Sequence, residues 1–273
     1  MKRIGILYHP KIDKAIAFSR ELEDFLRARR ISLWSCSAWE EEKANPQVTG
    51  SDLILSIGGD GTILRAARAI VPERVPIVGI NFGNLGFMTE LKADKALEIL
   101  PKLLEGEGWL EDRAMLQTQR DAESRIFHVL NDVVVGRGSS ARLVNIETRI
   151  DGELLTTYRA DGVIVSTATG STSYSLASGG PILQPQARDI ILNPVCSHLT
   201  MSESLVLNPE TEIRLKVATN HEAMLSLDGQ VESQLVSGEE VAVKLSPYVT
   251  RFLRIQPRNY FYNSLELRLK RRI

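Results

Sequence analysis

The sequence predicts two kinds of structure in one chain, a parallel α/β domain first and an antiparallel all-β domain after it. In the first third, short apolar runs alternate with longer segments whose apolar residues recur at helical spacing. Beyond residue 105, segments rich in Val, Ile, Leu and Thr follow one another with turn residues between them. No internal repeat or low-complexity linker separates the two halves. We therefore expect two closely packed domains.

The alternation in the first third predicts a parallel sheet with helices on both faces, because parallel strands need crossover connections. Residues 13–30 are expected to be helical, since Ile16, Phe18, Leu22 and Leu26 recur at helical spacing. The expected strands are 3–8, 31–36, 52–57 and 76–80, and the further expected helices are 62–70 and 93–105.

The second half is expected to be a sandwich or a related antiparallel fold. Asp151-Gly152, flanked by alternating runs, is a strong hairpin signal. In the final stretch, Tyr262, Leu265 and Leu269 recur at helical spacing, which predicts a terminal helix that returns to the first domain. The expected domains are 1–95, joined by 258–273, and 96–257.

The composition is that of an ordinary globular protein, with 273 residues, a formal net charge of −1 and 43% hydrophobic residues. Near-neutral charge offers no general attraction to nucleic acid or to an anionic membrane, so neither is expected as a partner. No apolar run approaches the roughly 18 residues of a membrane-spanning helix. Cys36 and Cys196 show no CxxC spacing, which argues against disulfides and thiolate metal sites and indicates a reducing, cytoplasmic location.

The segment GGDGT, residues 58–62, follows a predicted strand and precedes a predicted helix, where α/β sheets bind ligands. Glycines let the backbone approach an anion closely, and the free N–H groups at a helix start favour phosphate. The segment matches neither Walker A nor GxGxxG. Asp60 would repel phosphate, and it becomes useful where it faces a hydroxyl group or a magnesium ion. The alternative is a tight turn in which Asp60 caps the next helix.

A second candidate segment, residues 161–185, reads DGVIVSTATGSTSYSLASGGPILQP. Hydroxyl groups and backbone amides are dense at 170–175, directly after an apolar strand, and they suit the sugar and amide edges of a nucleotide. A serine- and glycine-rich loop without function is the alternative.

Two shorter motifs add carboxylates. Asn131 and Asp132 lie in a strand-like run, where unsatisfied polar groups are costly, so they face a ligand or else form a bulge or turn. Asp228-Gly229-Gln230 is typical of a hairpin turn. The four histidines form no HxxxH or HExxH pattern, and GxSxG does not occur, so metal-ligand and triad roles are not expected.

GGDGT, NFGNLGFM, NDVVV and the 161–185 segment occur in an order and at a spacing that resemble the NAD kinase family along nearly the whole chain. Lipid kinases of the diacylglycerol kinase type share GGDGT, whereas the 161–185 segment is close to diagnostic. The resemblance implies a Rossmann-like N-terminal domain, a C-terminal β-sandwich domain and a site in the cleft between them.

The resemblance also implies the reaction, in which the γ-phosphate of ATP passes to the 2′-hydroxyl of the adenosine ribose of NAD to give NADP. It implies Mg²⁺ or another divalent cation carried with ATP, and a homodimer or homotetramer. Some family members accept inorganic polyphosphate as donor.

Carried over to this chain, the resemblance gives Asp60 the role of general base, with Gly61 as the neighbouring backbone contact. Asp161 matches the carboxylate that recognises adenine, and Asn131 and Asp132 match the family's Asn-acidic pair. Arg142 is expected to reach the dinucleotide across a subunit interface, and Tyr174 to stack near the adenosine. The other positions matched to the nucleotide site are Arg65, Phe87, Met88, Arg159, Thr172, Ser173, Ser175, Leu176, Ala177, Cys196, His198 and Gln230.

Some alternatives stay open at this point. Ala168 and Ser173 stand where the family commonly has proline and alanine, which leaves the preference between NAD and NADH undecided. A lipid kinase would need an apolar acyl site, which the polar run at 170–175 disfavours. A catalytically silent dinucleotide sensor is disfavoured by the intact Asp60.

Overall fold

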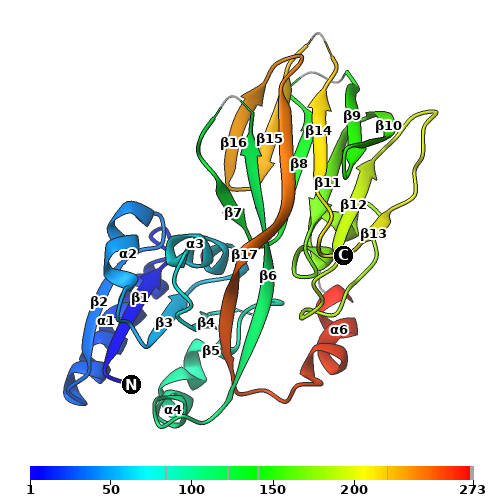
Figure 1. The fold of residues 1–273 in the computed structure, drawn as a ribbon. Coiled ribbons are helices and arrows are strands. Elements are labelled where there is room, and N and C mark those ends of the chain that lie inside the picture. Colours follow the sequence, from blue (N-terminus) through cyan, green and yellow to red (C-terminus); the bar gives the residue numbers. More distant parts are fainter. Residues whose placement is uncertain (84, 122, 140–141, 220, 271–273) are drawn as a thin grey trace. The chain divides into compact units, whose positions relative to one another are not determined.

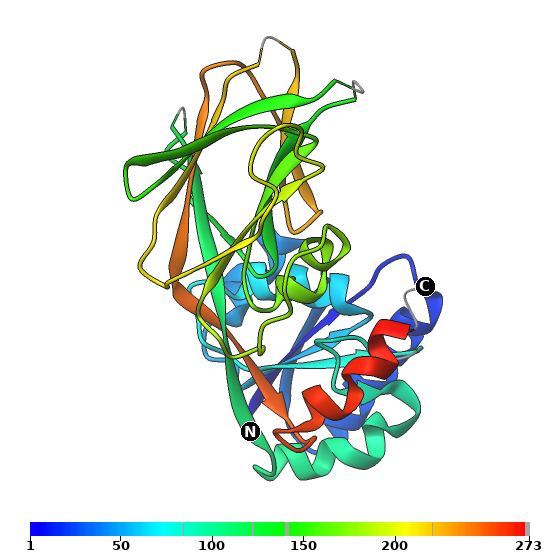
Figure 2. The same ribbon diagram turned by 90° about the vertical axis from the view of Figure 1, so that its right-hand side faces the viewer.

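The computed structural model describes residues 1–83, 85–121, 123–139, 142–219 and 221–270, and Asn84 in the NFGNLGFM stretch is outside them. The chain forms two compact units (Figure 1), unit 1 with residues 1–112 and 250–273 and unit 2 with residues 113–249. It passes from one unit to the other along two long strands, β6 (Trp109–Arg120) and β17 (Glu240–Arg254), which can be followed in Figures 1 and 2. Unit 1 continues past residue 95, and the domain boundaries expected from the sequence stay predictions.

Unit 1 is built on a parallel sheet with the strand order β4-β3-β1-β2. These strands lie within one residue of their predicted bounds, at β1 (Arg3–Tyr8), β2 (Ser32–Ser37), β3 (Leu53–Ile57) and β4 (Ile77–Asn81). The short β5 (Leu91–Lys92) and the end of β17 also pair with β4 in parallel. Every residue of β3 is buried, as expected for a strand covered on both faces. The predicted parallel α/β architecture is confirmed.

The helices of unit 1 are α1 (Asp13–Ala28), α2 (Glu41–Val48), α3 (Asp60–Ile70), α4 (Ala93–Leu104) and the C-terminal α6 (Tyr260–Lys270), red in Figure 2. The apolar stripe of α1 buries Phe18, Leu22 and Leu26 against the sheet core. The sequence did not predict α2, which contains Pro46. A proline inside a helix removes a backbone donor and normally argues against helical structure.

Unit 2 is an antiparallel sandwich, as predicted. One sheet has the order β13-β12-β11-β8-β15-β16, and β10, β9, β14, β17, β6 and β7 pair in the other. Buried residues of both sheets share one core, including Val133 and Val163 from the first and Ile146 and Leu215 from the second. The strand bounds are β7 (Phe127–Val129), β8 (Asp132–Arg137), β9 (Val144–Ile150), β10 (Glu153–Ala160), β11 (Gly162–Ser166), β12 (Ile190–Val195), β13 (Leu205–Leu207), β14 (Ile213–Val217), β15 (Ala223–Leu227) and β16 (Val231–Leu235).

Two turns in unit 2 follow their sequence signals. Asp151 and Gly152 join β9 to β10 with φ angles of 50° and 87°, and Asp228 and Gly229 join β15 to β16 with φ angles of 52° and 62°. Positive φ at both central residues is the requirement of the tight hairpin turns that Asp-Gly favours. Both hairpin predictions are confirmed.

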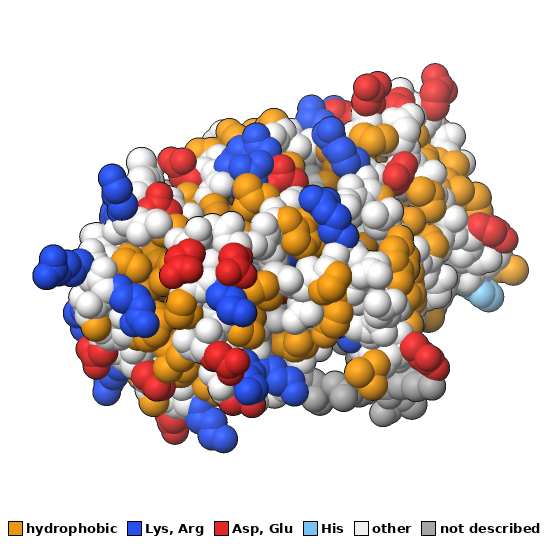
Figure 3. All heavy atoms as spheres, turned by 90° about the horizontal axis from the view of Figure 1, so that it is seen from below, with side chains coloured by type: hydrophobic (Ala, Val, Ile, Leu, Met, Phe, Trp, Pro, Cys, Tyr) orange, Lys and Arg blue, Asp and Glu red, His pale blue; other side chains and the backbone are white. Residues whose placement is uncertain are grey.

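The surface shows no separation of charge on the face drawn in Figure 3. Lys and Arg side chains are interspersed there with Asp and Glu side chains, in keeping with the net charge of −1. Among the described residues, no helix is both long enough and apolar enough to cross a membrane.

Candidate active site

Asp60 lies at the end of the buried strand β3, as the first residue of α3. Its carboxylate accepts three hydrogen bonds from consecutive backbone amides: Phe87 N to Oδ2 at 2.8 Å, Met88 N to Oδ1 at 3.1 Å and Thr89 N to Oδ1 at 3.2 Å. The alternative of a helix-capping aspartate is wrong, because the N-cap position is Gly59 and has no side-chain cap. We call residues 86–89 the amide loop.

Gly86 lets the amide loop close around this carboxylate. A Cβ atom at Gly86 would lie 2.3 Å from Asp60 Oδ1 and 2.4 Å from Oδ2, which real Cβ contacts do not allow. The Gly86 amide also donates to Thr89 Oγ1 at 2.7 Å, which closes the loop on itself. The second glycine of NFGNLGFM therefore has a steric function that the sequence alone did not reveal.

Arg65 lies further along α3 and stacks on the ring of Trp39. Its guanidinium carbon is 4.2 Å from the centre of the Trp39 ring, and that ring makes an edge contact with His9 at 4.5 Å between centroids. Burial, and next the charge of Arg68, lower the pKa of Arg65, which stays cationic at neutral pH. The sequence singled out Arg65 but gave no sign of Trp39.

Phe87 packs against the C-terminal helix. Its ring lies 6.4 Å from that of Phe261, and the Arg268 guanidinium carbon is 5.4 Å from its centre. Burial is the main cause that lowers the pKa of Arg268, with an opposing contribution from Tyr260. Gly61 follows Asp60 in the first turn of α3.

In unit 2, a second aspartate holds another run of backbone amides. The Asp228 carboxylate accepts from Leu130 N at 3.2 Å, Asn131 N at 2.7 Å and Asp132 N at 3.3 Å. The sequence assigned Asp228-Gly229 only to a turn. The structure adds that its side chain positions the predicted Asn131-Asp132 pair.

Asp132 is almost fully buried at the start of β8, directly opposite Ser166 of β11, so the segment forms regular sheet without a bulge at this pair. Burial, with a smaller contribution from the neighbouring Asp228 charge, raises the pKa of Asp132 to about 7. Two carboxylates close together in a poorly solvated place resist ionising together. Asp132 therefore holds a proton for much of the time near neutral pH.

The hydroxyl-rich segment that follows β11 folds back on itself as a 3₁₀ turn (Gly170–Thr172) and the short α5 (Tyr174–Ala177). Several hydroxyls satisfy nearby carbonyls: Thr167 donates to Leu130 O at 2.6 Å and Ser171 to Ala168 O at 2.6 Å. A Cβ atom at Gly170 would lie 2.2 Å from Asn131 O, so glycine permits this close approach. We expected the hydroxyl groups of residues 170–175 to be available to a ligand. This expectation is wrong for Ser171, whose hydroxyl already donates to a carbonyl of the same segment.

Some buried polar atoms of this segment and of the neighbouring Asn131 have no hydrogen-bond partner within the described residues. Within the described part of unit 2, Asn131 Oδ1, Thr169 Oγ1 and Ser175 Oγ are buried and have no hydrogen-bond partner. An unsatisfied buried polar group costs about 1–3 kcal/mol, which is tolerated mainly where a ligand or water supplies the missing partner.

Two neighbouring pockets meet at the half-exposed Tyr174. A pocket of about 620 Å³ is lined by Tyr174, Asp161 and Arg137 among others, and one of about 220 Å³ by Tyr174, Ser173, Asp132 and Asp228. Arg137 Nε lies 3.0 Å from Asp161 Oδ1, an ion pair that the sequence did not predict. Burial, followed by the charge of Asp161, raises the pKa of Tyr174.

The remaining predicted residues lie elsewhere in unit 2. Arg142 and Arg159 line a third pocket of about 530 Å³ with Thr219 and His221. The backbone amide of His198 donates to Arg159 O at 2.8 Å, Cys196 is exposed and has a free thiol, and Gln230 follows the Asp228-Gly229 turn. Thr172 and Ser175 are buried, whereas Leu176 is partly exposed and Ala177 exposed.

Sequence patterns did not reveal the contacts made by Gly86, Arg137 and Asp228. Gly86 and Asp228 each stand in a motif that was recognised, but their contacts reach residues far away in the chain. Arg137 ends β8 opposite the Asp161 backbone, with its amide donating to Asp161 O at 2.9 Å. Only the strand pairing could have placed the two charges together.

Unit 1 therefore joins strand, glycine turn and helix in the arrangement by which α/β proteins bind phosphate, and unit 2 is a sandwich with pockets of nucleotide size. Two family models match the chain: the ATP-NAD kinase N-terminal domain over residues 27–108 and the ATP-NAD kinase C-terminal domain over residues 130–255. The chain belongs to the NAD kinase family, as its motifs predicted.

Individual relatives are similar to this chain over nearly its whole length. An NAD kinase of Dehalococcoides mccartyi strain BAV1 is 46% identical over 98% of this chain and 96% of its own. An NAD kinase of Chloroflexus aggregans is 40% identical over 99% of both chains. Among solved structures, yeast NADH kinase complexed with NADH gives a TM-score of 0.84 at 25% identity, covering 99% of this chain and 88% of that one. An NAD kinase from Archaeoglobus fulgidus in complex with ATP gives 0.79 at 25% identity, covering 97% and 98%.

We expect Gly86→Ala to lower the turnover number at least about 10-fold, because the added methyl group displaces the carboxylate or the amide loop, and a shift of about 1 Å can cost about 10²-fold. Gly83→Ala is the matched control, since a Cβ atom there meets nothing within 4 Å. The test is to measure the turnover numbers of both variants by steady-state kinetics. Equal turnover in both would show that the close contact at Gly86 is unimportant.

We expect Asp132→Asn to make stability less dependent on pH. The raised pKa means that the folded protein binds a proton more tightly than the unfolded chain, so this stabilisation is complete below the ordinary value of 3.8 and is lost as pH rises towards about 7. Melting temperatures between about pH 5 and pH 8 should fall more steeply in the wild type than in the variant. Asp24→Asn, on an exposed part of α1, should follow the wild type. A constant gap between Asp132→Asn and wild type would contradict this assignment.

Proposed function

We propose how the side chains of both units carry out the NAD kinase reaction, in which the γ-phosphate of ATP passes to the 2′-hydroxyl of the adenosine ribose of NAD to give NADP. The observation that carries the proposal is the carboxylate of Asp60, fixed at the end of β3 by three backbone amides. Family membership along the whole chain supports the reaction.

Asp60 has room for one more hydrogen bond. An ionised carboxylate offers about four acceptor sites, and the amide loop occupies three of them. Among the described residues, Oδ2 accepts one hydrogen bond, from Phe87 N, and we therefore assign Oδ2 to the 2′-hydroxyl of the substrate. There Asp60 orients the hydroxyl oxygen for attack and accepts its proton as the bond to phosphorus forms.

The donor phosphates are assigned to the start of α3. Backbone N–H groups at a helix N-terminus favour anions, and Gly61 in the first turn leaves them accessible. Arg65 supplies a positive side chain on the same helix. Mg²⁺ or another divalent cation, carried with ATP, would neutralise charge on the transferred group. The relative from Archaeoglobus fulgidus, solved in complex with ATP, supports ATP as donor, and polyphosphate is proposed as a further donor on the family resemblance alone.

The dinucleotide is assigned to the pockets of unit 2. Asp161 would accept a hydrogen bond from the adenine amino group, and the half-exposed Tyr174 offers a ring for stacking. Asn131, Asp132 and the segment from Thr172 to Ala177 would bind the ribose and amide groups. The relative from yeast, solved with NADH, supports acceptance of a reduced dinucleotide as well.

Assembly and location are proposals of the same kind. A homodimer or homotetramer would allow Arg142 to act across a subunit interface, as the family resemblance implies. The two free cysteines are compatible with a cytoplasmic location.

Asp60→Asn tests the catalytic assignment. The kcat of the variant should fall about 10²-fold, which is the lower part of the range for general bases. In a loose transition state the bond to the attacking oxygen is only partly formed, so removal of its proton contributes less to the rate. The binding constant for NAD should change less, since one oxygen remains to accept a hydrogen bond. The new amide group would also face a backbone donor of the amide loop, so a modest fall in melting temperature is expected. The measurements are kcat, the dissociation constant for NAD and the melting temperature, made side by side. A folded variant with wild-type kcat would remove Asp60 from the mechanism.

Asp161→Ala tests the adenine assignment. The wild type should prefer NAD to its deamino analogue by about 5- to 150-fold in kcat/KM, which corresponds to the roughly 1–3 kcal/mol cost of an unpaired polar group. The variant should lose most of that preference. Arg137→Gln is the matched control, because it removes the partner of Asp161 and keeps the carboxylate. If Asp161→Ala prefers NAD to the deamino analogue as strongly as the wild type does, a group other than Asp161 recognises the adenine.

A further inference from the structure

Unit 1 contains a buried group of three charged side chains next to the amide loop. Arg254, the last residue of β17, is 5% exposed, and Glu90 and Glu111 are 4% and 7% exposed. Burial of charges is costly even when they are paired, and replacement by apolar residues is often neutral or stabilising. A group of this kind therefore calls for an explanation beyond stability.

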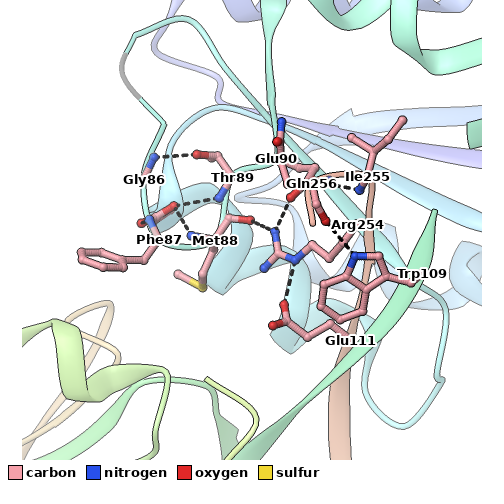
Figure 4. A network of polar contacts seen from close by, with 11 residues as sticks. Gly86, Phe87, Met88, Thr89, Glu90, Trp109, Glu111, Arg254, Ile255 and Gln256 are labelled. Carbon is pink, nitrogen blue, oxygen red and sulfur yellow. Dashed lines mark hydrogen bonds and ion pairs between the residues drawn. The ribbon is translucent and has the colours of Figure 1, made fainter. Parts of the chain in front are cut away.

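The hydrogen bonds of Arg254 spread in three directions, as Figure 4 shows. Nε donates to Glu111 Oε2 at 2.7 Å, and Nη1 donates to Glu90 Oε2 at 3.1 Å and to Met88 O at 2.7 Å. The other oxygen of Glu90 accepts from the amides of Ile255 at 2.8 Å and Gln256 at 2.7 Å. The two glutamates thus hold the guanidinium in place, and the guanidinium holds a carbonyl of the amide loop.

That carbonyl belongs to the same peptide unit as one of the amides that bind Asp60. Met88 O and Thr89 N are the two polar ends of one planar peptide group, so fixing the oxygen fixes the direction of the N–H. The oxygen accepts from Arg254 at 2.7 Å, and the N–H donates to Asp60 Oδ1 at 3.2 Å. The peptide dipole therefore lies between a cation at its negative end and a carboxylate at its positive end, and both contacts favour the same orientation.

We propose that Arg254 is a positioning residue for Asp60, acting through the Met88–Thr89 peptide, with Glu90 and Glu111 fixing the guanidinium. The inference rests on the catalytic role proposed for Asp60. Arginine suits the task because its planar fork reaches several acceptors at once and keeps its charge when buried. Lysine would keep the charge but cannot reproduce the fork.

The chain provides a matched control on the same two strands. Arg251 of β17 pairs with Asp112 of β6 through two hydrogen bonds of 2.7 and 2.9 Å, and its described contacts do not include the amide loop. Arg251→Lys therefore disturbs a comparable ion pair of unit 1 without disturbing Met88.

The experiment measures kcat, KM for NAD and melting temperature for Arg254→Lys and Arg251→Lys, each made in the wild type and in Asp60→Asn. Arg254→Lys should lower kcat about 10-fold with less than a 3-fold change in KM. A small misplacement of the Asp60 carboxylate is enough to slow the reaction without weakening the binding of NAD. In the Asp60→Asn background the same change should cost less than 2-fold, because the carboxylate that it positions has gone. Arg251→Lys should leave kcat unchanged in both backgrounds.

Each contrary result has a distinct meaning. Wild-type kcat in a folded Arg254→Lys protein overturns the inference, and so does an equal loss in both backgrounds, which would show an action independent of Asp60. If Asp60→Asn itself keeps full turnover, the proposed function of Asp60 fails, and the inference falls with it. Should Arg254→Lys not fold, Glu111→Gln serves instead, since it keeps Arg254 and weakens one of its anchors. It should lower kcat about 3-fold in the wild type alone, and an unchanged kcat there overturns the inference.

Discussion

Both units depend on the same interaction, an aspartate carboxylate that accepts hydrogen bonds from three consecutive backbone amides. In unit 1, Asp60 binds the amides of residues 87–89, and in unit 2, Asp228 binds those of residues 130–132. Charge-assisted bonds of this kind are about twice as strong as neutral ones. In each unit, three of them hold one short segment of backbone in place. Each carboxylate thereby orders a piece of chain that regular secondary structure leaves unpaired.

The consequence differs between the two aspartates. Asp60 stands at the start of a helix, so the interaction that orders the amide loop also fixes the carboxylate to which we assign the substrate hydroxyl. Asp228 lies beside Asp132, whose pKa is raised to about 7 mainly by burial and to a smaller extent by the charge of Asp228. Near neutral pH, Asp132 is therefore protonated for much of the time, and a protonated carboxyl group can donate a hydrogen bond as well as accept one.

The sequence was a good guide wherever a feature depends on neighbours in the chain. Apolar runs located β1 to β4 within one residue, and Asp-Gly pairs located two hairpins. The sequence did not predict features that depend on contacts between residues far apart in the chain. Helix α2 forms despite Pro46, and its buried Ala44 and Val48 show that packing outweighs local propensity there. Asp228 and Leu130 are 98 positions apart, and Arg254 and Met88 are 166 apart, so no local pattern could reveal these contacts. Several residues that the family resemblance assigns to the nucleotide site line pockets of unit 2, but the resemblance says nothing of the contacts that hold them.

These distant contacts also explain why unit 1 tolerates so much buried charge. Its apolar core includes the fully buried Ile4, Ile6, Leu55 and Val78 and does not include the three charged side chains. Stability can therefore come from that core, while the charged group holds the amide loop through the bond from Arg254 to Met88 O. A well-packed apolar replacement would keep the fold but would leave the Met88–Thr89 peptide free to turn. A buried charge that adds little to stability can in this way be kept for the orientation that it imposes on the Asp60 carboxylate, for which we propose the catalytic role.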